Sequence, residues 1–139
     1  MDLGLTGKRV IISGGSRGIG LAIARRFLQE GAQVALFARG AEGVAQTVES
    51  LQGIGTVFGA AVDAADHAGL REWIEQAAQQ LGGIDIVVNN TSASASIEWN
   101  EAAWRNSFEV DLMSAVVMAD AALPYLEASG AASVLQIAT

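Results

Sequence analysis

The sequence contains no cysteine, and its positive charge is sparse. Without cysteine the chain cannot form disulfides, Cys-ligated metal sites or a catalytic thiolate, so we expect a cytoplasmic setting. Only 8 of its 139 residues are Lys or Arg, against 15 Asp and Glu, which gives a net charge of −7. Because nucleic-acid binding depends on clustered cations, this balance argues against a nucleic-acid partner.

Long hydrophobic runs are also missing, although 51% of the residues are hydrophobic. No run reaches the roughly 18–20 residues of a membrane helix, and the N-terminus lacks the pattern of a signal peptide, so we expect no membrane partner. A single His without Cys is a poor ligand set, so no metal site is predicted. The apolar content suffices for one core, and we expect one domain over residues 1–139.

Short β-branched runs alternate along the chain with longer segments of helical period. Strands are predicted at residues 8–13, 33–38, 54–62, 84–89 and 133–138. The last helix is long, and Pro124 should kink or end it. This alternation predicts an α/β fold, a Rossmann-type doubly wound parallel sheet with helices on both faces. No segment follows the fifth strand, so we expect an incomplete, five-stranded sheet in a truncated chain.

A glycine-rich segment, SGGSRGIG from Ser13 to Gly20, joins the first predicted strand to the first predicted helix. Glycines let the backbone turn tightly and approach a pyrophosphate, and a helix N-terminus offers free N–H groups to an anion. In this strand–turn–helix context the segment predicts a dinucleotide-binding loop. The alternative is a tight turn without a ligand.

The end of the second predicted strand bears on the choice between NAD and NADP. A carboxylate there would bind a ribose 2′-hydroxyl and repel a 2′-phosphate. This chain has Ala38 followed by Arg39, no carboxylate before Glu42, and a second arginine, Arg17, in the glycine loop. Two guanidinium groups suit a dianionic phosphate, so the pattern favours NADP(H). The alternative is that both are solvated surface arginines.

These motifs resemble those of the short-chain dehydrogenase/reductase family along the whole chain. SGGSRGIG is similar to the family's TGxxxGxG loop, with Ser13 in place of Thr. Asp63 is similar to its adenine-contacting Asp, and Asn89-Asn90 is similar to the start of its NNAG motif. Thr91-Ser92 departs from that motif. The resemblance implies the N-terminal, cofactor-binding portion of the family. The expected cofactor-binding residues are Gly14, Ser16, Arg17, Gly18, Ile19, Gly20, Arg39, Asp63, Ala64 and Asn90.

The family's catalytic apparatus is only partly represented. The resemblance implies a Tyr as general acid/base, a Lys four residues later, a Ser and an Asn. The only Tyr is Tyr125, the only Lys is Lys8, and no Tyr-x-x-x-Lys pair exists in this chain. Asp111 falls where the family has its Asn, and Thr139 where it has its Ser, so these are the two candidate catalytic residues.

Asp111 shares a helix side with apolar residues, where a carboxylate is costly unless paired. The alternative is an isosteric replacement that holds a water or a backbone group. The long helix is apolar on more than one side, which predicts a homodimer or homotetramer.

We therefore expect an NADP(H)-dependent oxidoreductase that transfers hydride between NADPH and a small-molecule ketone or 3-oxoacyl carbonyl, or a secondary alcohol. The isolated chain should be inactive. The alternative is a non-catalytic dinucleotide-binding or sensing domain. A third possibility, a flavodoxin-like domain that binds FMN, is disfavoured by the two arginines.

Overall fold

A computed structural model describes residues 1–93 and 99–138. They form a five-stranded parallel sheet, with the strands in the order β3-β2-β1-β4-β5. The strands are β1 (Arg9–Ser13), β2 (Gln33–Ala38), β3 (Val57–Ala61), β4 (Ile86–Asn89) and β5 (Ser133–Gln136). The helices are α1 (Gly18–Gln29), α2 (Ala41–Leu51), α3 (His67–Leu81), α4 (Glu101–Ser107) and α5 (Ser114–Ser129), and a π-helical turn, η1 (Phe108–Met113), joins the last two.

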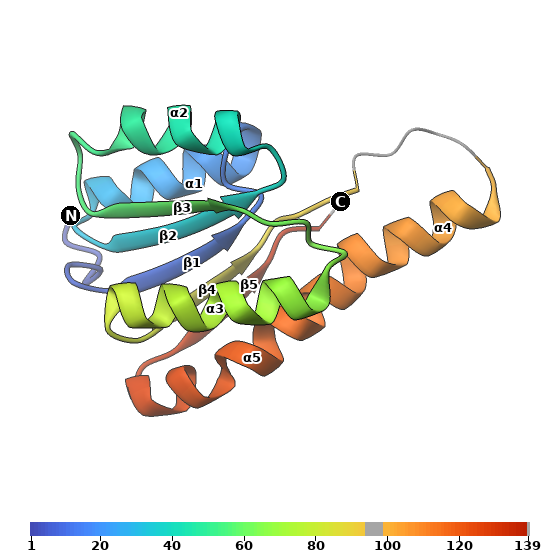
Figure 1. Cartoon of the computed structure of the whole chain (residues 1–139). Coiled ribbons are helices and arrows are strands. Elements are labelled where there is room, and N and C mark those ends of the chain that lie inside the picture. The colour runs from blue at the N-terminus through green and yellow to red at the C-terminus, as the bar shows by residue number, and fades with distance from the viewer. Residues whose placement is uncertain (94–98, 139) are drawn as a thin grey trace.

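The helices cover the two faces of the sheet in pairs, α1 with α2 and α3 with α5 (Figure 1). Successive residues of a strand point to opposite faces, so each central strand supplies both cores. Val10 and Ile12 pack on the α1/α2 side, whereas Ile11 packs on the α3/α5 side. This explains why the central strands are continuous apolar runs. The predicted doubly wound parallel fold is confirmed.

The strand order reverses between β1 and β4. From β1 the chain builds outward through β2 and β3, then crosses back to place β4 on the other side of β1, followed by β5. In open α/β sheets the crevice at the carboxyl ends of the strands beside such a reversal is where ligands bind. The topology therefore directs attention to the segments that follow β1 and β4.

Several element boundaries differ from the predicted ones. The third strand begins at Val57 instead of residue 54, because Ile54 lies in a turn whose N–H bonds the carbonyl of Leu51. Pro124 does not end α5, which continues to Ser129. Pro124 is exposed, so water can serve the carbonyl group that it leaves unbonded. In α1 the buried line runs through Gly20, Ala24 and Leu28, whereas Ile19 is exposed.

Candidate functional site

A cleft of about 770 Å³ opens at the carboxyl ends of the strands, where the topology reverses. Segments after four strands line it, and the α4–η1 region closes one side. Its lining includes nine of the twelve predicted site residues: Gly14, Ser16, Arg17, Gly18, Ile19, Arg39, Asp63, Ala64 and Asn90. Residues about 75 positions apart in the sequence thus share one cavity.

The glycine loop turns between β1 and α1 as the sequence predicts. Gly14 and Gly18 have positive φ angles, 67° and 56°, which side chains other than that of glycine adopt at a cost. A Cβ at Gly15 would lie 2.7 Å from the Cβ of Leu36, and one at Gly20 would overlap the carbonyl oxygen of Gly14. The loop therefore lies against β2 and folds back on itself, and Gly20 contributes by packing rather than by lining the cleft.

Side chains hold the loop by its carbonyl groups and by the end of β1. Asn90 donates from Nδ2 to the carbonyl of Gly14 over 3.2 Å. The Ser13 hydroxyl oxygen accepts from the backbone N–H groups of Asn90 (2.8 Å) and Thr91 (3.1 Å), which ties β1 to the segment after β4. Ser13 thus supplies the hydroxyl that the Thr of the family's motif would carry. The Thr47 hydroxyl donates to the carbonyl of Ser16 over 3.0 Å.

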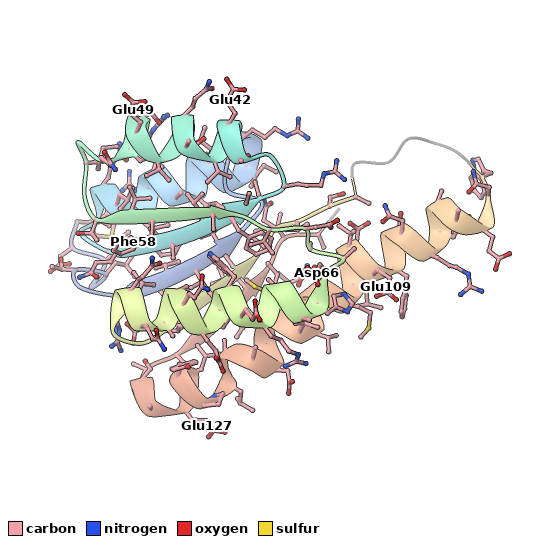
Figure 2. The ribbon with its side chains drawn as sticks, in the orientation of Figure 1. Glu42, Glu49, Phe58, Asp66, Glu109 and Glu127 are labelled. Carbon is pink, nitrogen blue, oxygen red and sulfur yellow. The ribbon has the colours of Figure 1, made fainter. Side chains whose placement is uncertain are left out.

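Arg17 and Arg39 stand at the same cleft from two different segments. Arg17 is the N-cap of α1 and Arg39 follows β2, and both side chains are exposed. Among the described residues, no carboxylate lies within ion-pair distance of either guanidinium. The nearest acidic residue after Arg39 in the sequence is Glu42, whose side chain points away from the sheet (Figure 2). The two cations are therefore free to meet an anion.

Asp63 and Ala64 form the part of the cleft that follows β3. Asp63 Oδ1 accepts the N–H of Ala65 over 2.9 Å, which holds the turn into α3. Ala64 is buried at the cleft wall. Asp66 then caps α3 by accepting the N–H of Gly69. The turn thus keeps one oxygen of Asp63 on the backbone and leaves the exposed carboxylate at the cleft.

The cleft carries the groups that a dinucleotide requires. The N-terminus of α1 has no side-chain cap, so its first N–H groups are available to an anion. Within the described residues, two buried oxygens lack a hydrogen-bond partner, Asn89 Oδ1 and Thr91 Oγ1, and both belong to the segment at the end of β4. Buried polar atoms without a hydrogen-bond partner are rare in folded proteins. The residues present therefore fit a nicotinamide dinucleotide.

Of the two candidate catalytic residues, the structure describes only Asp111. Asp111 lies in η1, where its Oδ1 accepts the N–H of Ala93 over 2.6 Å. Asp111 is exposed, and the alternative that it holds a backbone group agrees with this contact. Thr139 lies outside the described residues. Ala93 lines the cleft, whereas Asp111 does not.

The turn that carries Asp111 is tied to α3. His67 Nε2 lies 3.2 Å from the carbonyl oxygen of Glu109. Figure 2 shows Glu109 near the start of α3, where Asp66 is labelled. π-helical turns inside α-helices are frequent at functional sites. The contact fixes this turn beside the cleft.

The remaining acid/base candidates lie elsewhere. Tyr125, on α5, is partly buried against the α3/α5 core. Lys8 directly precedes β1, at the opposite edge of the sheet from the cleft. Neither lines the cleft. The geometry thus agrees with the absence of a Tyr–Lys pair from the sequence.

Two residues were not predicted from the sequence, one at the cleft and one behind its glycine loop. Asn106 of α4 lines the cleft, and nothing in its local sequence marks it. Thr47 is buried on α2 between apolar residues, and a polar residue on the apolar face of a helix is a signal that should have drawn attention. Among the described residues no group of three His, Asp or Glu could hold a metal ion. Likewise, none of the helices described is long and apolar enough to cross a membrane.

Comparison with known proteins gives consistent matches. A family model described as short chain dehydrogenase matches residues 8–139. The chain is 40% identical over 142 residues to the uncharacterized oxidoreductase YvrD of Bacillus subtilis, covering 100% of this chain and 54% of that protein. It is 32% identical over 143 residues to the 3-oxoacyl-[acyl-carrier-protein] reductase FabG of Chlamydia pneumoniae, covering 100% and 58%. The chain thus spans little more than half the length of these relatives.

Solved structures agree with the fold. L-sorbose reductase of Gluconobacter frateurii, complexed with NADPH and L-sorbose, superposes with a TM-score of 0.89 at 34% identity, over 98% of this chain and 54% of that one. A 7α-hydroxysteroid dehydrogenase complexed with NADH superposes with a TM-score of 0.91 at 28% identity, over 97% and 54%. From the matched family model, these relatives and the shared fold, the chain belongs to the short-chain dehydrogenase/reductase family.

Proposed function

We propose that this chain binds NADP(H) and forms the cofactor-binding part of an oxidoreductase that acts on a ketone, a 3-oxoacyl carbonyl or a secondary alcohol. The observation that carries the proposal is the pair Arg17 and Arg39. Both line one cleft and neither has a carboxylate partner among the described residues. Two guanidinium groups, with no carboxylate directly after β2, favour a ribose that carries a 2′-phosphate.

The other residues divide the binding of the dinucleotide between them. The glycine loop and the N-terminus of α1 would hold the pyrophosphate, because backbone N–H groups and the helix dipole favour an anion there. The free oxygen of Asp63 would accept from the adenine amino group. Asn90 keeps the loop in shape through the carbonyl of Gly14. When bound, the nicotinamide supplies the hydride.

We propose that the described residues at this cleft do not deliver the proton, because none of those that line it is a Tyr, Lys or His. Asp111 Oδ1 accepts the N–H of Ala93, so this oxygen already holds a backbone group. Losing a positioned acid removes about 10²–10⁴ in rate. We therefore expect no turnover by this chain alone when NADPH absorbance is followed with ketones and 3-oxoacyl thioesters. Clear turnover would contradict this and direct mutagenesis to Asp111, Thr139 and Tyr125.

Titration calorimetry with NADPH and NADH, at low and moderate salt, tests the cofactor proposal. NADPH should bind more tightly, and Arg39→Asp should weaken NADPH at least about tenfold while changing NADH little, since a charged hydrogen bond contributes about 1.5–3 kcal/mol. Arg25→Asp makes the same charge change on α1 outside the cleft and is the matched control. Equal affinities for the two cofactors in the parent chain would reject the proposal that Arg17 and Arg39 bind the 2′-phosphate.

A second function, dinucleotide sensing without catalysis, is favoured by one observation: neither Tyr125 nor Lys8 lies at the cleft. This alternative predicts NADPH binding and no reductase activity in any longer form of the protein. The reductase proposal predicts activity once a segment with a Tyr-x-x-x-Lys pair is present. Assaying the longest natural form of the chain separates the two.

We also propose that the protein assembles as a homodimer or homotetramer. An exposed apolar stripe runs along one side of α4, η1 and α5, formed by Trp104, Phe108, Leu112, Val116 and Leu123. A contiguous apolar stripe of this kind marks a protein interface. Light scattering should show a mass above the monomer that falls in Leu112→Lys, whereas a monomer over a wide concentration range would reject the proposal.

A further inference from the structure

Thr47 is a polar residue on the apolar face of α2. It is 7% exposed and lies one turn from Val44 and Leu51, which pack against the sheet. A hydroxyl buried in such a place is unfavourable unless it is hydrogen-bonded. Its partner is the carbonyl oxygen of Ser16, 3.0 Å away and 31 residues earlier in the chain. In the described structure this hydroxyl therefore bonds the glycine loop and holds it against α2.

The bond fixes the orientation of one peptide unit of the loop. The carbonyl of Ser16 and the N–H of Arg17 belong to the same peptide group, which is planar and trans, so they point in opposite directions. With the carbonyl held toward α2, the N–H of Arg17 points away from α2. Together with the φ angle of Arg17, −157°, this peptide orientation sets the direction in which the Arg17 side chain leaves the loop.

Thr47 also links the two segments that carry the arginines. Arg39 directly precedes Gly40, the N-cap of α2, and Thr47 lies two turns further along the same helix. The Gly15 N–H donates to the carbonyl of Phe37 on β2 over 3.1 Å, which makes a second link nearby. The loop is thus held against the β2–α2 unit at two points, and the Thr47 contact is the one adjacent to Arg17.

We propose that Thr47 is a positioning residue that sets Arg17 relative to Arg39 and so determines the preference for a 2′-phosphorylated cofactor. The inference rests on the proposed NADP(H) function and deepens it. Thr47 does not line the cleft, so it acts through the loop and touches no cofactor atom itself. Loss of its hydroxyl should weaken ligands with a 2′-phosphate and spare those without one.

Binding experiments test this without any activity assay. We expect Thr47→Val to weaken NADPH and adenosine 2′,5′-bisphosphate about three- to tenfold, as for one lost hydrogen bond, and to leave NADH and 5′-AMP within about twofold. Thr47→Ser keeps the hydroxyl and should restore the phosphate preference. Ser50→Ala is the matched control, because the Ser50 hydroxyl bonds only within α2, to the carbonyl of Thr47.

The outcomes separate the two proposals. A parent chain that prefers NADPH, with the preference unchanged in Thr47→Val, overturns the role of Thr47 and leaves the proposed function intact. A parent chain without any preference overturns both. An equal loss of all four ligands in Thr47→Val, without rescue by Thr47→Ser, means that Thr47 serves only folding and rejects its role in specificity. Thermal unfolding of each variant identifies a chain that fails to fold. If Thr47→Val fails to fold, the test is whether Thr47→Ser keeps the parent's preference for ligands with a 2′-phosphate, and loss of that preference overturns the role of the hydroxyl.

Discussion

The edge of the sheet where the strands begin and the edge where they end differ in how their polar groups are paired. At the edge where the strands begin, Arg9 and Asp85 form a bidentate ion pair, with Nε–Oδ2 at 2.9 Å and Nη2–Oδ1 at 3.0 Å. Arg9 Nη1 also donates to the carbonyl of Gly82, and the Ser129 hydroxyl donates to Asp85 Oδ1. The network joins β1, β4, α3 and α5. The guanidinium of Arg9 holds the pKa of the Asp85 carboxyl well below its usual range.

At the edge where the strands end, groups are left available. Arg17 and Arg39 have no carboxylate partner among the described residues, and Asn89 Oδ1 and Thr91 Oγ1 have no hydrogen-bond partner. The same strands run between the two edges, so one sheet carries paired polar groups at one edge and unpaired polar groups at the other. Saturated polar contacts thus hold the sheet where the strands begin, whereas the groups without partners lie where the strands end, at the cleft that we propose binds the cofactor.

We call the edge where the strands begin, with its Arg9–Asp85 network, the closed edge, and the edge at the cleft the open edge. Removing Asp85 should disrupt the closed edge and leave the open edge intact. Asp85→Ala leaves the Arg9 guanidinium without its partner, and we expect the free energy of unfolding to fall by about 3–5 kcal/mol. NADPH affinity of the folded fraction should stay within about twofold. Chemical denaturation gives the first quantity and calorimetry the second. Asp120→Asn, which breaks an exposed ion pair with Arg71, should change stability by less than about 1 kcal/mol.

A substitution in the glycine loop should instead affect the open edge and leave the Arg9–Asp85 network intact. In Gly20→Ala the new methyl group meets the carbonyl of Gly14, so the loop must shift, and we expect NADPH affinity to fall about 30- to 100-fold, or about 2–3 kcal/mol. Gly43→Ala is the control, because a Cβ there meets open space on a helix that also lines the cleft. If Gly20→Ala bound NADPH like the parent, the close packing of the loop would have no role in binding.

Most of the fold and of the cleft could be predicted because the signals are local. Apolar runs mark the central strands, Gly82 ends α3 in the left-handed conformation, and the glycine loop lies between a strand and a helix. Strand boundaries were less accurate. Residues 54–56 are apolar or small like the strand that follows. The paired register of β3 with β2 starts only at Val57, opposite Val34, and no local pattern marks that point.

The residues that were missed owe their roles to distant partners. Thr47 bonds a carbonyl 31 residues away, and Asp85 bonds a residue 76 positions away. No local pattern specifies such contacts, although each residue leaves a trace: a threonine on an apolar helix face and an aspartate within the apolar run IDIVV. Asp111 lies in a helical segment, as the sequence predicts, but periodicity does not reveal that this segment is a π-helical turn.

Acid should weaken the network that Asp85 forms with Arg9. The pKa of Asp85 is lowered on folding, so its contribution to stability is complete above the unfolded pKa of about 3.9 and is lost as the pH falls through the folded pKa. We therefore expect the stability difference between the parent and Asp85→Asn to shrink by about 1 kcal/mol between pH 5 and pH 3. Denaturant titrations at both pH values measure it. A constant difference would mean that Asp85 titrates alike in the folded and unfolded chains.

The smallest effect concerns the hydroxyl that completes the closed edge. Ser129 donates to Asp85 Oδ1 over 2.5 Å, and Ser129→Ala should lower stability by about 1 kcal/mol at pH 7 without changing NADPH affinity. Hydrogen bonds to an ionised acceptor are about twice as strong as neutral ones, so the same substitution should matter less in an Asp85→Asn background. A double-mutant cycle measures this coupling. Additive effects would show that Ser129 acts on Asp85 only by filling space, and the closed edge would then depend on the Arg9 pair alone.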